Sequence, residues 1–139
     1  MEWISLDGVP WWSLLIAVVV TFALGWVWYS PVGFFPLWAR LGKLTPEDMK
    51  SSNMAVAFGG TLAGNILGVV LLGVLISSLG VSGIWQGALL GGVIGLVFRG
   101  GAHAVHNGFA ARHPGITLID AAADTVSLAV AGAIVGAFV

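Results

Sequence analysis

Four long apolar segments, separated by shorter polar stretches, dominate the pattern of hydrophobic and polar positions along the chain. They cover about residues 11–29, 53–79, 84–106 and 116–138. An α-helix rises about 1.5 Å per residue, so each segment is long enough to cross a hydrocarbon core of about 30 Å. The pattern predicts an all-α, polytopic membrane protein, in which residues 1–139 form a single domain with four transmembrane helices in a bundle.

The connection between the first two segments is the long polar one, and it has its own structural signals. Apolar and aromatic side chains are mixed there with Arg40 and Lys43, which is typical of a segment that lies in the membrane interface. Farther along, Thr45 precedes Pro46 and two acidic residues, the order expected where a helix begins. We therefore expect an interfacial segment between helices 1 and 2, with a helix start at Thr45.

Composition supports the membrane class and excludes several others. The 139 residues are 58% hydrophobic and 8% charged, whereas soluble domains carry about 25% charged residues. The formal net charge is −1, with no basic patch, so the expected partner is the lipid bilayer and no nucleic acid. The chain has no cysteine, which excludes disulfides, thiolate metal sites and cysteine nucleophiles.

The basic residues predict the orientation in the membrane. Arg40, Lys43 and Lys50 lie between the first two apolar segments, and Arg99 and Arg112 lie near the end of the third. All five would then be on one side, and lysine and arginine are enriched in cytoplasmic loops. We expect these two connections in the cytoplasm, with the N-terminus and the C-terminus on the outer side.

Glycine recurs at a spacing of four in three of the apolar segments. Such faces allow another helix to approach closely within a membrane. The positions are Gly60, Gly64 and Gly68, then Gly87, Gly91 and Gly95, then Gly132 and Gly136. We expect these glycine-rich faces to drive contacts within the bundle or between copies, and hence a homo-oligomer, either a dimer or a trimer.

Most ionisable groups inside the apolar segments fall between Arg99 and Ser127. Three side chains on the third segment share one helix face at i, i+4 and i+7, and three on the fourth repeat this spacing. With the neighbouring amide they form the predicted polar intramembrane cluster: Arg99, His103, His106, Asn107, Asp120, Asp124 and Ser127.

Folding the third and fourth segments antiparallel places these polar side chains in register. His106 then faces Asp120, His103 faces Asp124, and Arg99 faces Ser127 with Asp124 within reach. Arg99 would lie about 7 Å inside the cytoplasmic end of its helix, with its side chain directed deeper into the membrane. A charge at that depth requires a partner or a polar cavity.

The cluster is compatible with three kinds of chemistry. Arg99 and Asp124 can form a structural ion pair. Histidine beside carboxylates can also form a path for protons or ions, because histidine titrates near neutral pH. Third, two imidazoles and two carboxylates suit a divalent metal such as zinc or iron, although His-x-x-His is a weak motif and arginine-paired carboxylates are poor ligands. These candidate metal ligands are His103, His106, Asp120 and Asp124; otherwise no cofactor is expected.

Three further residues are candidates for a vestibule. Trp28 and Tyr29 end the first segment on the predicted cytoplasmic side, where interface anchoring is their simplest role and lining a cavity mouth the alternative. Asn65, in the middle of the second segment, is expected to make an interhelical hydrogen bond, with a ligand contact as the alternative. Ser127 has no nucleophile elbow around it and the glycines form no phosphate loop, so no catalytic residues are assigned and an enzyme is not favoured.

Two stretches carry a family resemblance. They are Gly25-x-x-Trp28-Tyr29-Ser30-Pro31-x-x-Phe34-x-x-x-Trp38, and the later combination of His106-Asn107-Gly108-Phe109, Arg112 and Leu118-Ile119-Asp120. Together they resemble the uncharacterised bacterial membrane-protein family catalogued as domain of unknown function 1761. Phe35 and Pro36 depart from the glycine and basic residue usual after the family's phenylalanine. The resemblance implies a small multi-pass protein of the bacterial cytoplasmic (inner) membrane and implies no activity.

Taken together, these patterns favour an integral membrane protein that acts as a small homo-oligomeric transporter, channel or solute-binding protein with a polar site on the cytoplasmic side. Two alternatives stay open. One is a metal-binding membrane enzyme or sensor, and the other is a structural or partner-binding membrane subunit.

Overall fold

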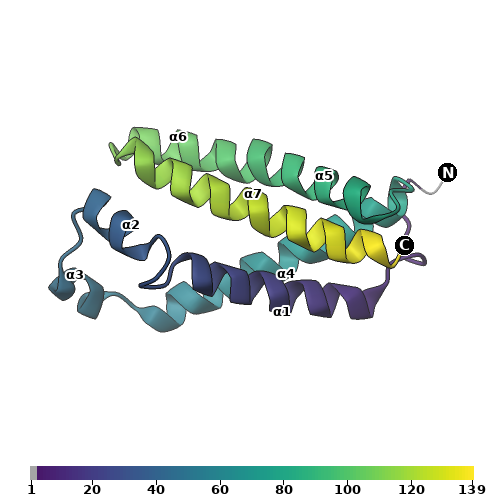
Figure 1. Ribbon diagram of the computed structural model, residues 1–139, viewed down its shortest axis with the longest axis horizontal. Coiled ribbons are helices and arrows are strands. Elements are labelled where there is room, and N and C mark those ends of the chain that lie inside the picture. The colour runs from purple at the N-terminus through teal and green to yellow at the C-terminus, as the bar shows by residue number, and fades with distance from the viewer. Residues whose placement is uncertain (1–2) are drawn as a thin grey trace.

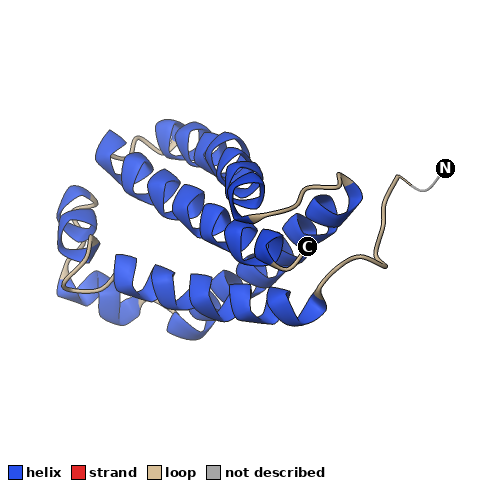
Figure 2. Cartoon of the chain, turned by 45° about the vertical axis from the view of Figure 1, so that its right-hand side comes forward, coloured by secondary structure: helices blue, strands red, loops and turns tan. Residues whose placement is uncertain are grey.

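The computed structural model describes residues 3–139, and over that range it contains helices and no strands (Figure 2). Four rods are long and apolar enough to cross a membrane, and they pack together as predicted. The rods are α1 (Trp11–Trp28), α4 (Met54–Ser78), the continuous run of α5 (Ile84–Ile94), the π-helix η1 (Gly95–Gly100) and α6 (Gly101–Phe109), and finally α7 (Pro114–Ala137).

Two short helices form the connection between α1 and α4. They are α2 (Phe35–Leu41) and α3 (Pro46–Ser51), and both lie at the end of the bundle opposite the termini (Figure 1). Thr45 caps α3 with a capping box, in which its side chain accepts from the Asp48 backbone N–H and the Asp48 carboxylate accepts from the Thr45 backbone N–H. The predicted helix start at Thr45 is confirmed, but the helix stops at Ser51 and is separate from α4.

The third rod differs most from the predicted boundaries. The sequence pattern predicts an end near residue 106, whereas the helix continues to Phe109. It stops there because Ala111 adopts a left-handed conformation with φ 54°, which lets the Arg112 backbone N–H bond to the Asn107 carbonyl. Arg99 consequently lies ten residues, or about 15 Å, from the end of its rod, deeper than the predicted 7 Å.

The most extensive interhelical contact joins α5 to α7, and glycine makes it possible. A Cβ added at Gly91 would overlap the Leu128 backbone carbonyl. Likewise, a Cβ at Gly87 would overlap the Gly132 carbonyl, and a Cβ at Gly132 would overlap the Gly87 carbonyl. The two helix backbones therefore touch directly, as small residues allow in membranes. These glycine faces are used inside the bundle.

The π-helix explains how the glycine face continues past Gly95. Gly95 and Gly100 are both buried against α7, although five residues separate them. In a regular α-helix a step of five turns about 140° beyond a full turn, so one of the two would face away. The wider π turn, with its i→i+5 bonding, keeps both on the α7 side.

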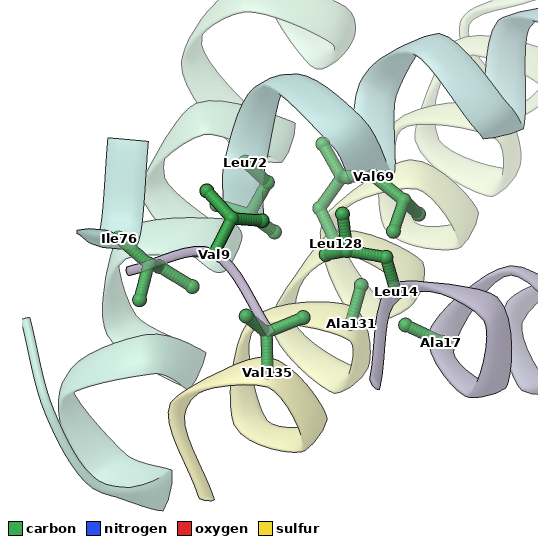
Figure 3. Close-up of a cluster of buried hydrophobic side chains, with 9 residues drawn as sticks. All are labelled: Val9, Leu14, Ala17, Val69, Leu72, Ile76, Leu128, Ala131 and Val135. Carbon is green, nitrogen blue, oxygen red and sulfur yellow. The ribbon is translucent and has the colours of Figure 1, made fainter. Parts of the chain in front are cut away.

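The buried apolar core occupies the half of the bundle nearer the termini. Its side chains come from the segment before α1 and from α1, α4 and α7, as Figure 3 shows. They are Val9, Leu14, Ala17, Val69, Leu72, Ile76, Leu128, Ala131 and Val135. In contrast, residues 54–63 of α4 are all exposed. The described chain therefore has an apolar half, and its polar contacts concentrate toward the α2–α3 end.

Candidate functional site

Asp124, near the middle of α7, binds two side chains from the third rod. Its Oδ1 lies 3.2 Å from Nη1 of Arg99, and its Oδ2 lies 2.7 Å from Nε2 of His103. The predicted pairing of both residues with Asp124 is therefore confirmed. We call Arg99, His103, Asp124 and the Gly64 backbone carbonyl the Asp124 cluster.

Arg99 also reaches a third helix, which the sequence pattern does not reveal. Its Nη2 donates to the backbone carbonyl of Gly64 on α4, at 3.0 Å. The guanidinium passes so close to Gly68 that a Cβ there would lie 2.6 Å from Nη2. Arg99 thus joins η1, α4 and α7, and Gly68 leaves the space for it.

The Asp124 cluster is deep along the helices and only partly covered. Asp124 lies ten residues, or about 15 Å, from the first residue of α7. The side chains of Arg99, His103 and Asp124 keep 32%, 34% and 25% of their surface exposed. A partly uncovered charge at mid-membrane depth is expensive unless water or protein meets it. The remaining exposed surface is therefore a place where a solute or another chain can make contact.

Asp120, one turn away on α7, has an entirely different set of partners. Its Oδ1 accepts hydrogen bonds from the Tyr29 hydroxyl, at the end of α1, and from Nε1 of Trp38, on α2, the latter at 3.1 Å. The rings of Tyr29 and Trp38 also meet edge to face, with centroids 6.2 Å apart. We call Tyr29, Trp38 and Asp120 the Asp120 cluster.

The predicted contact of His106 with Asp120 is wrong. His106 is exposed, and its side chain makes no hydrogen bond within residues 3–139. Helical spacing alone did not account for α2, which folds back beside α7 and supplies the donor Trp38. Trp38 belongs to the same sequence motif as Tyr29. This shared motif was the sequence feature that could have indicated that the two side chains act together.

Two further members of the predicted polar cluster also lie elsewhere. Ser127 is half-buried, and no hydrogen bond joins it to Arg99 in the described part of the chain. Asn107 is buried and serves the α6–α7 turn, because its Nδ2 donates to Thr117 Oγ1 at 3.1 Å. Both residues thus lie on the observed helices α6 and α7 but outside the Asp124 cluster.

The three vestibule candidates make three separate sets of contacts. Asn65 makes the predicted interhelical hydrogen bond: its Nδ2 donates to the Val18 carbonyl at 3.1 Å, and its Oδ1 accepts from Thr21 at 3.0 Å. Trp28 packs on Phe34, with ring centroids 4.8 Å apart, and its buried indole N–H has no hydrogen-bond partner within residues 3–139. Tyr29 is engaged by Asp120, so these three residues serve three separate contacts.

The four candidate metal ligands do not converge. His103 and Asp124 are bonded to each other, Asp120 turns to Tyr29 and Trp38, and His106 stays exposed. Across residues 3–139, no group of three or more His, Cys, Asp or Glu side chains is placed to hold a metal ion. The chemistry that this arrangement supports is charge pairing and proton transfer along the His103–Asp124 hydrogen bond.

Comparison with known proteins supports the family suggested by the sequence motifs. Neither the curated proteins nor the solved structures contain a match to this chain. The family model described as "Protein of unknown function (DUF1761)" matches residues 12–136, which includes all four long rods apart from their outermost residues. The chain therefore belongs to the DUF1761 family of proteins of unknown function.

Proposed function

We propose that this protein is a small membrane transporter or channel, and that the Asp124 cluster is the polar element met by the transported proton, ion or small solute. One observation carries the proposal. Nε2 of His103 lies 2.7 Å from Asp124 Oδ2, within rods that are apolar enough to span a membrane. Ionisable residues inside such segments usually mark ion or proton pathways.

The geometry around Asp124 supports proton transfer in particular. Arg99 occupies Oδ1 and stabilises the carboxylate, while His103 shares a proton with Oδ2. Histidine is the side chain whose charge changes most readily near neutral pH. A third of the His103 side chain stays exposed, which leaves it open to a transported species.

A homo-oligomer, dimer or trimer, in a bacterial inner membrane is part of this proposal. The glycine faces of α5 and α7 are used within one chain, whereas a Cβ at Gly60 or Gly64 of α4 would touch no described atom within 4 Å. A second copy on that side of α4 would cover apolar surface and adjoin the Asp124 cluster through Gly64. The basic residues of both connections favour a cytoplasmic α2–α3 end, with the termini outside.

Flux measurements in proteoliposomes test the proposal. Purified protein is reconstituted with a pH-sensitive dye inside the vesicles, and proton, common-ion and small-solute gradients are imposed in turn. We expect wild-type flux that falls at least about tenfold in His103→Gln and in Asp124→Asn, because each removes one partner of the proton-sharing hydrogen bond. The matched control is His106→Gln, which changes an exposed histidine one turn away and should retain flux.

Two results would reject this function. One is wild-type protein, correctly assembled in vesicles, that passes none of the tested species. The other is equal flux in wild type and in Asp124→Asn, since the cluster would then be irrelevant to transport.

A structural subunit is the second candidate, and the three-helix contact of Arg99 favours it. A clasp that joins η1, α4 and α7 needs no transported species. Under this alternative the wild type catalyses no flux, and exchanging the charges with Arg99→Asp and Asp124→Arg preserves the folded assembly seen by size-exclusion chromatography. Flux that depends on His103 would exclude it.

A further inference from the structure

Basic side chains surround a cavity at the α2–α3 end of the bundle. The cavity has a volume of about 410 Å³ and lies between the turn after α2 and the turn between α6 and α7. Lys43, Arg112 and His113 line it, with Leu41 and Ile116 as apolar wall. No acidic side chain lines it in the described chain. Volumes of about 300–1,000 Å³ are typical of small-molecule sites.

Arg112 is held in place without using up its donors. Its backbone N–H bonds to the Asn107 carbonyl at 3.0 Å, its Nη1 lies 3.5 Å from Asn107 Oδ1, and its Cζ lies 5.8 Å from the centre of the Trp38 ring. A guanidinium carries five N–H donors in a planar fork. Most of them stay available to an anion in the cavity, and the fork suits phosphate geometry.

His113 adds a further donor, and the start of α7 adds the positive end of its helix dipole. Nδ1 of His113 accepts a hydrogen bond from the Gly115 backbone N–H at 2.9 Å. In the neutral ring the proton is then on Nε2, which can donate to a ligand. His113 is also the N-cap of α7, a helix of 24 residues, whose dipole favours negative charge at this end.

Lys43 is placed by the same type of helix end as Arg112. The Leu44 backbone N–H bonds to the Ala39 carbonyl at 3.0 Å, just as the Arg112 N–H bonds to Asn107, and each bond spans a residue with φ 54°, Lys43 and Ala111 respectively. Both are Schellman-type ends in which glycine is the usual residue. Two such turns, from segments far apart in the sequence, bring their basic residues to one cavity.

We propose that this cavity binds a phosphate group, supplied either by the headgroup of an anionic phospholipid or by free phosphate. Lys43, Arg112 and His113 provide donors from two chain segments, and the cavity offers no lining carboxylate to compete. The nearest acid along α7, Asp120, is already bonded to Tyr29 and Trp38. The site is independent of the Asp124 cluster and of the transport proposal.

Other basic residues of the same connection supply matched controls. Arg40 and Lys50 are exposed, carry the same charge, and do not line the cavity. A general attraction of basic loops to an anionic membrane would depend on these residues as much as on the lining ones. A phosphate site would depend on the lining residues Lys43, Arg112 and His113, and not on Arg40 or Lys50.

The test uses the full chain in uncharged detergent and in bilayers. Binding of inorganic phosphate alone is titrated by calorimetry. In parallel, lipid retention is followed by native mass spectrometry after reconstitution in phosphatidylcholine, either alone or mixed with phosphatidylglycerol. We expect Arg112→Gln and Lys43→Gln each to weaken binding at least about tenfold, as loss of a hydrogen bond to a charged group does, and Arg40→Gln and Lys50→Gln to bind within about twofold of wild type.

The two arms distinguish the source of the phosphate. Selective retention of phosphatidylglycerol without binding of inorganic phosphate identifies a lipid headgroup, whereas binding of inorganic phosphate identifies a soluble ligand; both support the site. Absence of both kinds of binding in the wild type, or equal losses in Arg40→Gln, overturns it. Thermal unfolding checks that each variant is folded.

Discussion

Asp120 and Asp124 lie one turn apart on the same helix, yet they are held by different chemistry. Asp124 has a cationic or titratable partner at each oxygen, both from the third rod. Asp120 has two neutral donors at a single oxygen, the Tyr29 hydroxyl and the Trp38 indole, from α1 and α2. A carboxylate at mid-membrane depth is thus paired with charge, and the one nearer the helix end is held by polar aromatic side chains.

The difference follows from what each level of the bundle can supply. At the level of Asp124 only the long rods are present, so the partners must come from their own side chains and from a helix carbonyl, that of Gly64. At the level of Asp120 the chain leaves α1 and returns as α2, which brings Trp38 beside α7. The comparison teaches that i, i+4 spacing places two residues on one face but does not choose their neighbours.

The largest effect should come from removing the charge at Asp124. Asp124→Asn keeps the side-chain shape and leaves the Arg99 guanidinium without its counter-charge in an apolar segment. Removing one partner of a buried ion pair typically costs about 3–5 kcal/mol, and because a quarter of Asp124 is exposed we expect the lower end, about 3 kcal/mol. Thermal or denaturant unfolding in detergent measures the change.

Asp120→Asn is the comparison for that measurement, under the same detergent and pH. If Asp124→Asn destabilises the protein no more than Asp120→Asn does, the ion pair makes no special contribution and the contrast between the two clusters fails.

A second variant separates the charge of Arg99 from its shape. Arg99→Lys keeps the positive charge, but an ammonium group lacks the planar fork that bonds to Asp124 Oδ1 and the Gly64 carbonyl together. We expect a loss of about 1.5 kcal/mol, roughly that of one hydrogen bond made by a charged group. Unfolding of Arg99→Lys in a Gly68→Ala background should show the two changes to be non-additive, because both act on the Gly64 contact.

How much of this could be foreseen from the sequence differs between the two clusters. Apolar runs predicted the four rods, and i, i+4 spacing predicted that Arg99 and His103 meet Asp124. These inferences rest on periodicity and on antiparallel register, which are local properties. The role of the Gly64 carbonyl could not be predicted, because every residue has a backbone carbonyl. The residue type does not indicate which carbonyl accepts a hydrogen bond from a distant side chain.

The Asp120 cluster and the π-helix needed information beyond spacing. Tyr29 and Trp38 lie in one short motif, but whether α2 turns toward α7 or away depends on tertiary packing. The π-helix had a weak signal in the glycine steps of four, four and five from Gly87 to Gly100. In an α-helix the five-residue step would turn Gly100 away from the face shared by Gly87, Gly91 and Gly95. This mismatch was the sequence feature that indicated an irregular turn.

A third variant measures the neutral-donor cluster itself. Asp120→Asn leaves an amide oxygen that can still accept from Tyr29 and Trp38, so we expect a loss of about 1 kcal/mol, a third of that for Asp124→Asn. Tyr29→Phe should lose a similar amount, because it removes one of the two donors. The intrinsic fluorescence of Trp38, recorded in a variant that lacks the other tryptophans, should shift in Asp120→Asn if its indole bond weakens. A loss as large as 3 kcal/mol would show that Asp120 carries an ionic role comparable to that of Asp124.

The smallest net effect is expected at Gly68, where two opposing contributions partly cancel. A Cβ there would lie 2.6 Å from Arg99 Nη2, so the guanidinium must move and its bond to the Gly64 carbonyl is lost, at about 1.5 kcal/mol. Replacing glycine by alanine inside a helix returns about 1 kcal/mol through helix propensity. We therefore expect the unfolding free energy of Gly68→Ala to lie about 0.5 kcal/mol below the wild-type value.

Gly60→Ala separates the two contributions, because a Cβ at Gly60 touches no described atom within 4 Å and only the propensity gain remains. The difference between the two variants, about 1.5 kcal/mol, is then the contribution of the contact between Arg99 and α4. Equal stability of Gly60→Ala and Gly68→Ala would mean that Arg99 keeps its full stabilising effect without α4. The Asp124 cluster would then be a two-helix ion pair, whereas the Asp120 cluster joins α7 to α2 and to the end of α1.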